Sequence, residues 1–381
     1  MRKLAFDNLP LFNGAPKTWE ASGNFIYEDL RGFFYEGLPY HGKPTRVFAW
    51  MGFPKDASAE HPVPGIVLVH GGGGTAFPDW IKLWTDMGFA AIAMDNCGGT
   101  PCWRPSLHHN PEWPRHEWSG PGGWGNRDNK EANLEDQWPF HAIGAVLNAF
   151  ELLRSCPQVD ADRIGVTGIS WGGYLTCLAA SLEERFRFAI PVYGCGGFDT
   201  PMSTLLRSFT HEQRTAWFKA WDPDLYLGES NVPFLWLTDA EDSAFPLHLW
   251  CHSSSLTRNP LTRRSLRIDY VHDHTISWKS KTIPAFANGC LEGTVFPNLA
   301  EPAIAGNVIT CAWTSGDSAP LSANLAYTRA DGYWADRRWR VASANIEGNT
   351  LTAELSPGTR AAFFQLRTAD GCLWTSPVAI L

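Results

Sequence analysis

The stretch RIGVTGISWGGY, residues 163–174, holds one serine among glycines. It contains the pattern G-x-S-x-G, centred on Ser170. The apolar run 163–169 predicts a strand, and the small residues from Gly172 onward predict a helix. A serine on such a sharp turn takes a strained backbone conformation that exposes its Oγ, and the glycines let strand and helix pass closely. Because free N–H groups at the helix start favour negative charge, the pattern predicts a nucleophilic serine.

A serine hydroxyl needs a positioned base, and at a strand–turn–helix serine the partners follow in the order acid, then histidine. Three carboxylates, Asp239, Glu241 and Asp242, follow the apolar run 233–238. We favour Asp242 as the acid because a few loop residues separate it from the strand and Pro246 closes the turn behind it. Asp239 is the main alternative.

Two histidines in three residues follow the apolar run 266–271, in the segment HDHTISW. Histidine suits the role of base because its pKa lies near neutrality and a carboxylate can hold its tautomer. Either His272 or His274 could reach Ser170. His274 lies further out on the loop, so we expect it to be the base. His272 is the alternate, or a supporting group.

Two backbone N–H groups should stabilise the oxyanion, one after the nucleophile and one from a loop after an earlier strand. Trp171 supplies the first N–H group. The run His70–Gly74 follows the strand-like segment GIVLVH, and we expect the second donor near Gly72. A phosphate cradle is the other interpretation of these glycines, but neither G-K-[ST] nor GxGxxG spacing is present.

Residues 96–132 carry Gly, Pro, Trp and His without periodicity, and a loop of this length is usually functional. Trp103 and Trp124 in this loop, together with His70, could line an acyl or sugar pocket. Packing of the loop itself is an equal alternative for the tryptophans. The histidines of the loop show none of the usual ligand spacings, so we predict no metal site.

The elements that must position these groups alternate between strand and helix, which predicts an α/β fold with a mostly parallel sheet flanked by helices. Near-continuous apolar runs predict buried strands. The expected strands are 46–52, 65–70, 90–95, 163–169, 188–194, 233–238 and 266–271, and the expected helices are 79–88, 133–155 and 172–182.

The pattern changes near residue 285, where short alternating runs separated by Gly, Pro, Asp and Asn replace the helices. Such spacing predicts a small β-sandwich. We therefore expect two domains. Residues 1–285 would form the catalytic domain with an N-terminal extension, and residues 286–381 an Ig-like β-sandwich.

Composition narrows the classes of partner. The 381 residues carry a net charge of −8 without a basic run, so we expect no nucleic acid partner. No apolar run is long enough to cross a membrane, and no membrane partner is expected. Pro10 and Asn13 interrupt any signal peptide, which predicts a cytoplasmic protein, although a secreted mature form stays open. Nine cysteines without a CxxC pair fit a reducing compartment.

Four segments together resemble one superfamily: HGGGGTAFPDWIKLWTDMGFAAIAMD, GISWGGY, LWLTDAEDSAFPL and HDHTISW. They are similar to the α/β-hydrolases, above all bacterial acetyl xylan esterases and the related dienelactone hydrolases and prolyl-oligopeptidase-like catalytic domains. The resemblance covers roughly residues 45–285. It implies a serine esterase without metal or organic cofactor. It also implies Asp242, four residues before Pro246, as the acid and the second histidine, His274, as the base.

The function expected from this combination is hydrolysis of an acyl ester of a carbohydrate, with an acetyl group as the expected acyl. The substrate would be a small-molecule or oligosaccharide ester. One alternative is a serine peptidase of the prolyl-oligopeptidase type, although only about 45 residues precede the first expected sheet strand here, where those peptidases carry a large propeller. The other alternative is a carbohydrate-binding protein with a degenerate hydrolase site. The oligomeric state cannot be predicted from the sequence.

Overall fold

The computed structural model describes residues 6, 9, 14–23, 25–101, 113–123, 133–197 and 209–381. A nine-stranded sheet forms the centre of the first two thirds of the chain, and its strands run in the order β1-β4-β5-β7-β6-β8-β9-β10-β11. From β7 to β11 neighbouring strands are parallel, whereas β1, β4 and β5 add antiparallel pairs at one edge. The strands are β1 (Thr18–Glu20), β4 (Phe33–Glu36), β5 (Arg46–Gly52), β6 (Val63–Val69), β7 (Ala90–Met94), β8 (Val159–Ile169), β9 (Ala189–Val192), β10 (Leu235–Asp239) and β11 (Arg263–Arg267). A short hairpin of β2 (Ile26–Tyr27) and β3 (Leu30–Arg31) lies outside this sheet.

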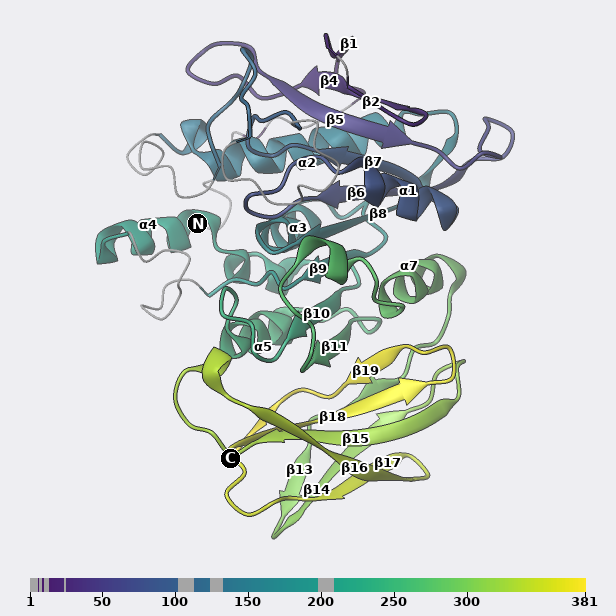
Figure 1. Ribbon diagram of the computed structural model, residues 1–381, viewed down its shortest axis with the longest axis vertical. Coiled ribbons are helices and arrows are strands. Elements are labelled where there is room, and N and C mark those ends of the chain that lie inside the picture. The colour runs from purple at the N-terminus through teal and green to yellow at the C-terminus, as the bar shows by residue number, and fades with distance from the viewer. Residues whose placement is uncertain are drawn as a thin grey trace.

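Helices cover both faces of this sheet (Figure 1). They are α1 (Pro78–Asp86), α2 (Trp138–Arg154), α3 (Trp171–Leu182), α4 (His211–Trp221), α5 (Leu247–Leu256), α6 (His274–Ser277) and α7 (Thr282–Glu292). Successive side chains of a strand point to opposite faces, and β8 shows which helices share a face. Its Gly168 lies against α3, whereas the flanking Thr167 and Ile169 lie beneath α1 and α7. No helix among the described residues is long and apolar enough to cross a membrane.

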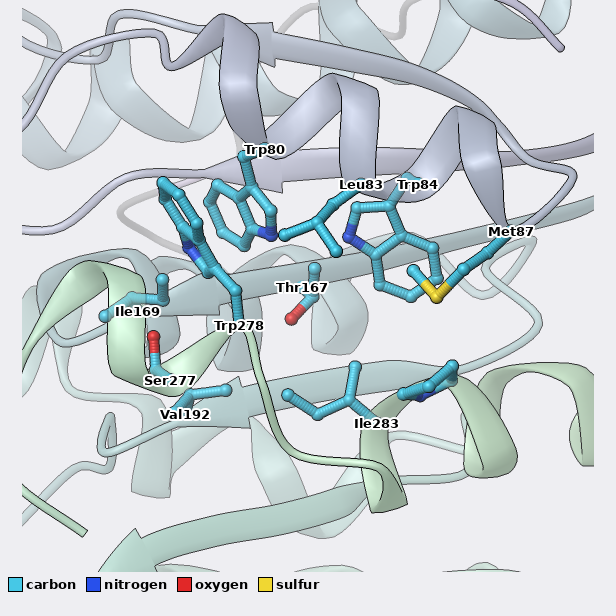
Figure 2. Close-up of a pocket in the computed structure, with 11 residues that line it drawn as sticks. Trp80, Leu83, Trp84, Met87, Thr167, Ile169, Val192, Ser277, Trp278 and Ile283 are labelled. Atoms are coloured by element: carbon cyan, nitrogen blue, oxygen red, sulfur yellow. The ribbon is translucent and has the colours of Figure 1, made fainter. Parts of the chain in front are cut away.

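The face beneath α1 is packed with tryptophan. Figure 2 shows the indoles of Trp80 and Trp84 descending from α1 beside Trp278, above the strand residues Thr167 and Ile169. The Trp80 and Trp278 rings stack with centroids 5.5 Å apart. The largest fully buried side chains of the described residues include Trp50, Trp84, Trp138, Trp171, Trp221, Trp236 and Trp250. Many of the 19 tryptophans therefore stabilise the core around the first sheet through their large buried areas.

A second sheet, built only from antiparallel pairs, lies beyond β11 in Figure 1. Its strands are β12 (Asn298–Leu299), β13 (Ala303–Ala305), β14 (Val308–Thr314), β15 (Pro320–Thr328), β16 (Trp339–Glu347), β17 (Thr350–Glu354), β18 (Ala361–Thr368), β19 (Leu373–Thr375) and β20 (Ala379–Ile380). The sheet follows the path β12-β14-β17-β16-β15-β18-β19 and curls into a small sandwich. This confirms the predicted fold class, an α/β-hydrolase architecture with a C-terminal β-sandwich.

The second sheet covers the edge of the first. Leu266 in β11 donates its N–H to Thr375 Oγ1 at 3.1 Å and accepts a hydrogen bond from Gln365 Nε2 at 3.3 Å. Both partners belong to the second sheet. An uncovered edge strand would present unpaired backbone groups, so these contacts protect β11.

Several predicted boundaries differ from the structure by a few residues, and two of the differences bear on the site or on the domain division. The strand expected at 266–271 lies at Arg263–Arg267, because beyond it the N–H of Tyr270 bonds to the Asp239 side chain instead of a neighbouring strand. Helix α7 crosses residue 285, and the second sheet begins only with β12. The division into 1–285 and 286–381 stays a prediction. The sequence analysis did not predict helices α4 to α7, and of these α4 and α5 have weak apolar periodicity.

Candidate active site

Ser170 occupies the turn between β8 and α3, with φ 59° and ψ −119°. A positive φ is rare for a residue with a side chain and is maintained only where the surroundings hold it. Here the Ser170 N–H donates to Val192 O at 2.8 Å, and Ser170 O accepts from the Tyr174 N–H at 3.0 Å. The turn is thus tied to β9 on one side and to the first turn of α3 on the other, as in a nucleophile elbow.

The glycines of the elbow are required for close backbone packing. A Cβ on Gly168 would collide with the carbonyl of Gly172, and a Cβ on Gly172 would collide with the carbonyl of Val69 in β6. Helix α3 therefore starts pressed against the ends of β6 and β8. This packing brings Ser170 to the same edge of the sheet as the loop that follows β6.

The structure pairs Asp242 with His272. Asp242 Oδ2 lies 2.6 Å from His272 Nδ1, and Asp242 Oδ1 accepts N–H bonds from Ala244 at 2.8 Å and Phe245 at 2.7 Å. The carboxylate is 3 % exposed. An ionised carboxylate can only accept hydrogen bonds, so the bond to Asp242 places the His272 proton on Nδ1. Nε2 is then the unprotonated, basic nitrogen of the ring.

The His272 ring is clamped between two aromatic rings. It stacks on Tyr193 with centroids 4.4 Å apart and lies parallel to Phe245 at 6.2 Å. Tyr193 itself has φ 63°, and its hydroxyl donates to Val271 O at 2.7 Å, which ties it to the histidine loop. Burial raises the pKa of the Tyr193 phenol, so it stays a neutral donor. The sequence analysis missed Tyr193 and Phe245, although both are aromatic residues in loops directly after buried strands.

His274, the base expected from the sequence, does not bond to Asp242 but faces the glycine loop close to Ser170, since a Cβ on Gly71 would lie 3.1 Å from His274 Nε2 and 2.9 Å from Ser170 Cβ. Its Nε2 accepts the N–H of Gly71 at 3.1 Å, and its ring packs against Phe77 with centroids 5.3 Å apart. The reason is local: Asp273 caps helix α6 by accepting N–H bonds from the next turn, and His274 is the first residue of that helix. The imidazole is thereby directed toward the glycine loop, and Asp242 bonds to the alternate, His272.

Asp239 is the alternative acid. Within the described residues its carboxylate accepts hydrogen bonds from backbone N–H groups only. Its Oδ1 accepts the Glu241 N–H at 2.7 Å, and its Oδ2 accepts the Tyr270 N–H. Burial raises the pKa of Asp239 to about 6. Through these two hydrogen bonds Asp239 links the loop after β10, which carries Asp242, to the loop after β11, which carries His272.

Of the two expected oxyanion donors, Trp171 directly follows the serine, and Gly72 belongs to a loop whose first glycine, Gly71, lies against Ser170. The N–H of Trp171 belongs to the first turn of α3, where backbone N–H groups have no acceptor within the helix. The glycine loop, residues 71–74, is closed by the Gly74 N–H bonding to Gly71 O at 3.0 Å, and Gly73 has φ 69°. Gly72 therefore sits at the tip of a tight turn. Indole Nε1 of Trp113 donates to Gly73 O at 2.9 Å and fixes the outer side of that turn.

His70 supports the glycine loop from within. It is 1 % exposed, its Nε2 accepts the Asn96 N–H at 3.0 Å, and its Nδ1 bonds to Gly71 O at 2.7 Å. Burial lowers the pKa of the imidazole, which favours the neutral ring. His70 was expected to line the substrate pocket, but it faces backbone groups on both sides.

Asp95 adds a second support. It accepts hydrogen bonds from Thr75 at 2.9 Å and from the Cys97 and Gly99 N–H groups, joining the loops after β6 and β7.

The remaining expected pocket residues, Trp103 and Trp124, lie outside the described residues. Among the described residues, no group of three or more His, Cys, Asp or Glu side chains is arranged to hold a metal ion. Ser170 Oγ makes no hydrogen bond to either imidazole within the described chain. Catalytic hydrogen bonds are often long without substrate and tighten in the complex.

Comparisons with known proteins agree with this architecture. Residues 34–198 match the family model for acetyl xylan esterase (AXE1). Among solved structures, the acetyl xylan esterase from Paenibacillus sp. R4 superimposes with a TM-score of 0.55 at 20 % identity, covering 76 % of this chain and 92 % of that one. Acetyl xylan esterase 1 from Thermoanaerobacterium sp. JW/SL YS485 gives 0.52 at 17 % identity, covering 73 % and 88 %.

A curated relative carries a different name. Dipeptidyl-peptidase 5 of Porphyromonas gingivalis is 25 % identical over 182 residues, which are 46 % of this chain and 22 % of that protein. The chain spans about a quarter or less of the length of the curated relatives it matches.

The fold and the elbow together have the α/β-hydrolase architecture. Within that architecture the chain resembles the acetyl xylan esterases, whose family model matches residues 34–198.

Proposed function

We propose that this chain is a serine esterase that removes an acyl group, with acetyl as the expected acyl, from a carbohydrate ester. Two observations carry the proposal: the short Asp242–His272 hydrogen bond between the loops after β10 and β11, and a serine held at positive φ after β8. A carboxylate, an imidazole and a strained serine on three neighbouring loops supply the groups that acyl transfer requires.

In the proposed reaction Ser170 Oγ attacks the ester carbonyl while His272 Nε2 takes its proton. Asp242 holds the Nδ1–H tautomer and stabilises the imidazolium that forms. The backbone N–H groups of Trp171 and Gly72 would stabilise the oxyanion of the tetrahedral intermediate. His272 then returns the proton to the departing alcohol, and water releases the acyl group from Ser170 by the reverse sequence of proton transfers.

The acetyl xylan esterase match favours an acetylated carbohydrate as substrate. The dipeptidyl-peptidase match favours a second candidate, cleavage of a peptide by the same nucleophile. Both reactions use one acyl-enzyme route, so they differ in the acyl donor and not in the catalytic groups.

The proposal is tested with a fluorophosphonate probe and a substrate panel. We expect covalent labelling of the wild-type chain at Ser170, and acetylated xylo-oligosaccharides and p-nitrophenyl acetate to be hydrolysed faster than the butyrate ester. Ser170→Ala should lose both the label and activity by at least about 10⁴-fold. Turnover of a dipeptide p-nitroanilide above that of the acetyl esters would make the peptidase the better description. A wild-type chain that neither labels nor hydrolyses any of these substrates would refute the mechanism.

A further inference from the structure

The loop that carries Asp242 is held on both sides by the second sheet. We call residues 333–339 the clasp. They form the end of the connection from β15 to β16, together with the first residue of β16. Arg338 Nη1 in the clasp donates to Glu241 Oε2 at 2.9 Å, and the Trp339 N–H lies 3.4 Å from Glu241 Oε1. The Tyr333 hydroxyl donates to Ser243 O at 2.9 Å. The two residues that flank Asp242 are therefore both bonded to the clasp.

The clasp is itself ordered by packing. The Arg337 guanidinium lies 3.5 Å from the centroid of the Trp334 ring and donates to Gly332 O. Trp334 is 8 % exposed and stacks on His248 of α5, with centroids 6.2 Å apart. Because this segment is fixed by its own contacts, little further conformational entropy is lost when it holds the acid loop.

The second sheet also holds the strand that leads to the histidine loop. Both backbone groups of Leu266 in β11 bond to side chains of that sheet, as described above. Residues 268–271 then connect β11 to His272. The acid and the base of the proposed site thus depend on one external support, whereas the backbone hydrogen bonds of Ser170 go to Val192 and Tyr174, outside the second sheet.

We propose that Arg338 and Tyr333 are positioning residues that hold Asp242 in register with His272. This inference rests on the proposed function. The Arg338 side chain is 79 % exposed, and an exposed ion pair stabilises a fold by less than about 1 kcal/mol. Displacing a catalytic group by a fraction of an ångström costs far more in rate. The contacts of Arg338 and Tyr333 therefore affect the geometry of the Asp242–His272 pair more than the free energy of unfolding.

The test compares the double variant Tyr333→Phe, Arg338→Ala with a matched control in the full chain. The control is Arg360→Ala, which removes a second exposed ion pair of the same sheet, Arg360 to Asp331 at 3.3 Å, without touching the acid loop. Rates are measured with p-nitrophenyl acetate and divided by the number of sites that a fluorophosphonate titrates. We expect kcat per titrated site to fall about 5- to 20-fold in the double variant, with KM within 2-fold and Tm within about 2 °C. The control should match the wild type.

Two further readouts separate positioning from a loss of folding. The charge swap Glu241→Arg with Arg338→Glu should recover at least half of the rate lost by Arg338→Glu alone. The proton NMR resonance of His272 Nδ1–H, which reports its bond to Asp242, should broaden or shift in the double variant and stay unchanged in Arg360→Ala.

Unchanged kcat per titrated site and an unchanged Nδ1–H resonance in the double variant would overturn the proposed role. An equal loss in the control, or no recovery in the charge swap, would also overturn it. If the wild-type chain neither hydrolyses the ester nor reacts with the probe, the proposed function fails, and the Nδ1–H resonance alone decides whether the clasp orients the pair.

Discussion

The glycine loop next to Ser170 and the Asp242–His272 pair are held by different parts of the chain. Residues 71–74 are fixed by His70, Asp95 and His274, all within the first sheet and its loops. The pair is fixed in part by the second sheet, through Glu241 and Ser243. The oxyanion side is therefore self-contained, whereas the proton-transfer side extends across to a separate layer of structure.

This difference indicates how the two proposed tasks, oxyanion stabilisation and proton transfer, are divided between parts of the chain. Stabilising an oxyanion requires rigid donors, which a buried and glycine-packed loop supplies. Proton transfer requires an imidazole that can approach both the serine and the leaving group, and the His272 side chain is 30 % exposed. An exposed ring needs its orientation fixed from outside the core.

The largest expected effect breaks the proton-transfer side alone. We expect His272→Gln to lower kcat about 10³-fold or more, because the variant removes the proposed general base and leaves the proposed oxyanion donors in place. His274→Gln is the comparison, and it should lower kcat only about 10-fold, through a looser Gly71. Steady-state kinetics with p-nitrophenyl acetate measures both. A larger loss in His274→Gln than in His272→Gln would reverse the assignment of the two rings.

An intermediate effect breaks the oxyanion side and also presses on Ser170. In Gly71→Ala the new Cβ would lie 2.6 Å from Ile169 O and 2.9 Å from Ser170 Cβ, so the loop must shift. We expect kcat to fall about 10²-fold, as when an oxyanion donor is lost, and stability to fall by about 1–3 kcal/mol. Gly228→Ala is the control, because its new Cβ meets open space. The His272 Nδ1–H resonance should be unchanged in both variants, and its loss in Gly71→Ala would show that the two sides are not independent.

The smallest expected effect concerns Asp239, which joins the acid and histidine loops. Because burial raises its pKa to about 6, the folded state binds this proton more tightly than the unfolded state. Its contribution to stability is thus full near pH 4 and declines by about 2–3 kcal/mol as the pH rises to about 6. Asp239→Asn does not titrate.

The variant should therefore be most destabilised relative to the wild type at pH 4, and the gap should narrow toward pH 7. Urea unfolding at several pH values measures this difference, with the exposed Asp331→Asn as the control. A gap that widens as the pH rises would mean that the folded state stabilises the ionised form of Asp239.

Much of the framework could be predicted from sequence. The expected strand at 46–52 coincides with β5, and the apolar runs around Ser170 lie on β8 and α3, because fully buried strands and small-residue helices leave strong local patterns. The pairing of Asp242 could not be assigned, because His272 and His274 share one loop and differ only in where helix α6 begins. Asp273, with the hydroxyl of Thr275 two residues further on, was the available sign of a helix start there.

The clasp lay beyond sequence reasoning for another reason. Arg338 is an exposed arginine in a polar turn, and nothing in its local pattern distinguishes it from Arg337 or Arg360. Its partner Glu241 is 97 residues away in the chain. Contacts of that range follow from how the two sheets meet, which depends on the whole tertiary structure.

The covering of β11 also has a consequence for how the chain is made. Leu266 emerges from the ribosome 109 residues before Thr375, the residue that caps its N–H. During that interval the outer edge of the growing parallel sheet is open to strands of neighbouring chains. Co-expression with a chaperone that shields exposed strands, or slow expression at a low concentration of nascent chains, should therefore raise the yield of native protein. We expect this gain to exceed that of any surface substitution in the folded β-sandwich.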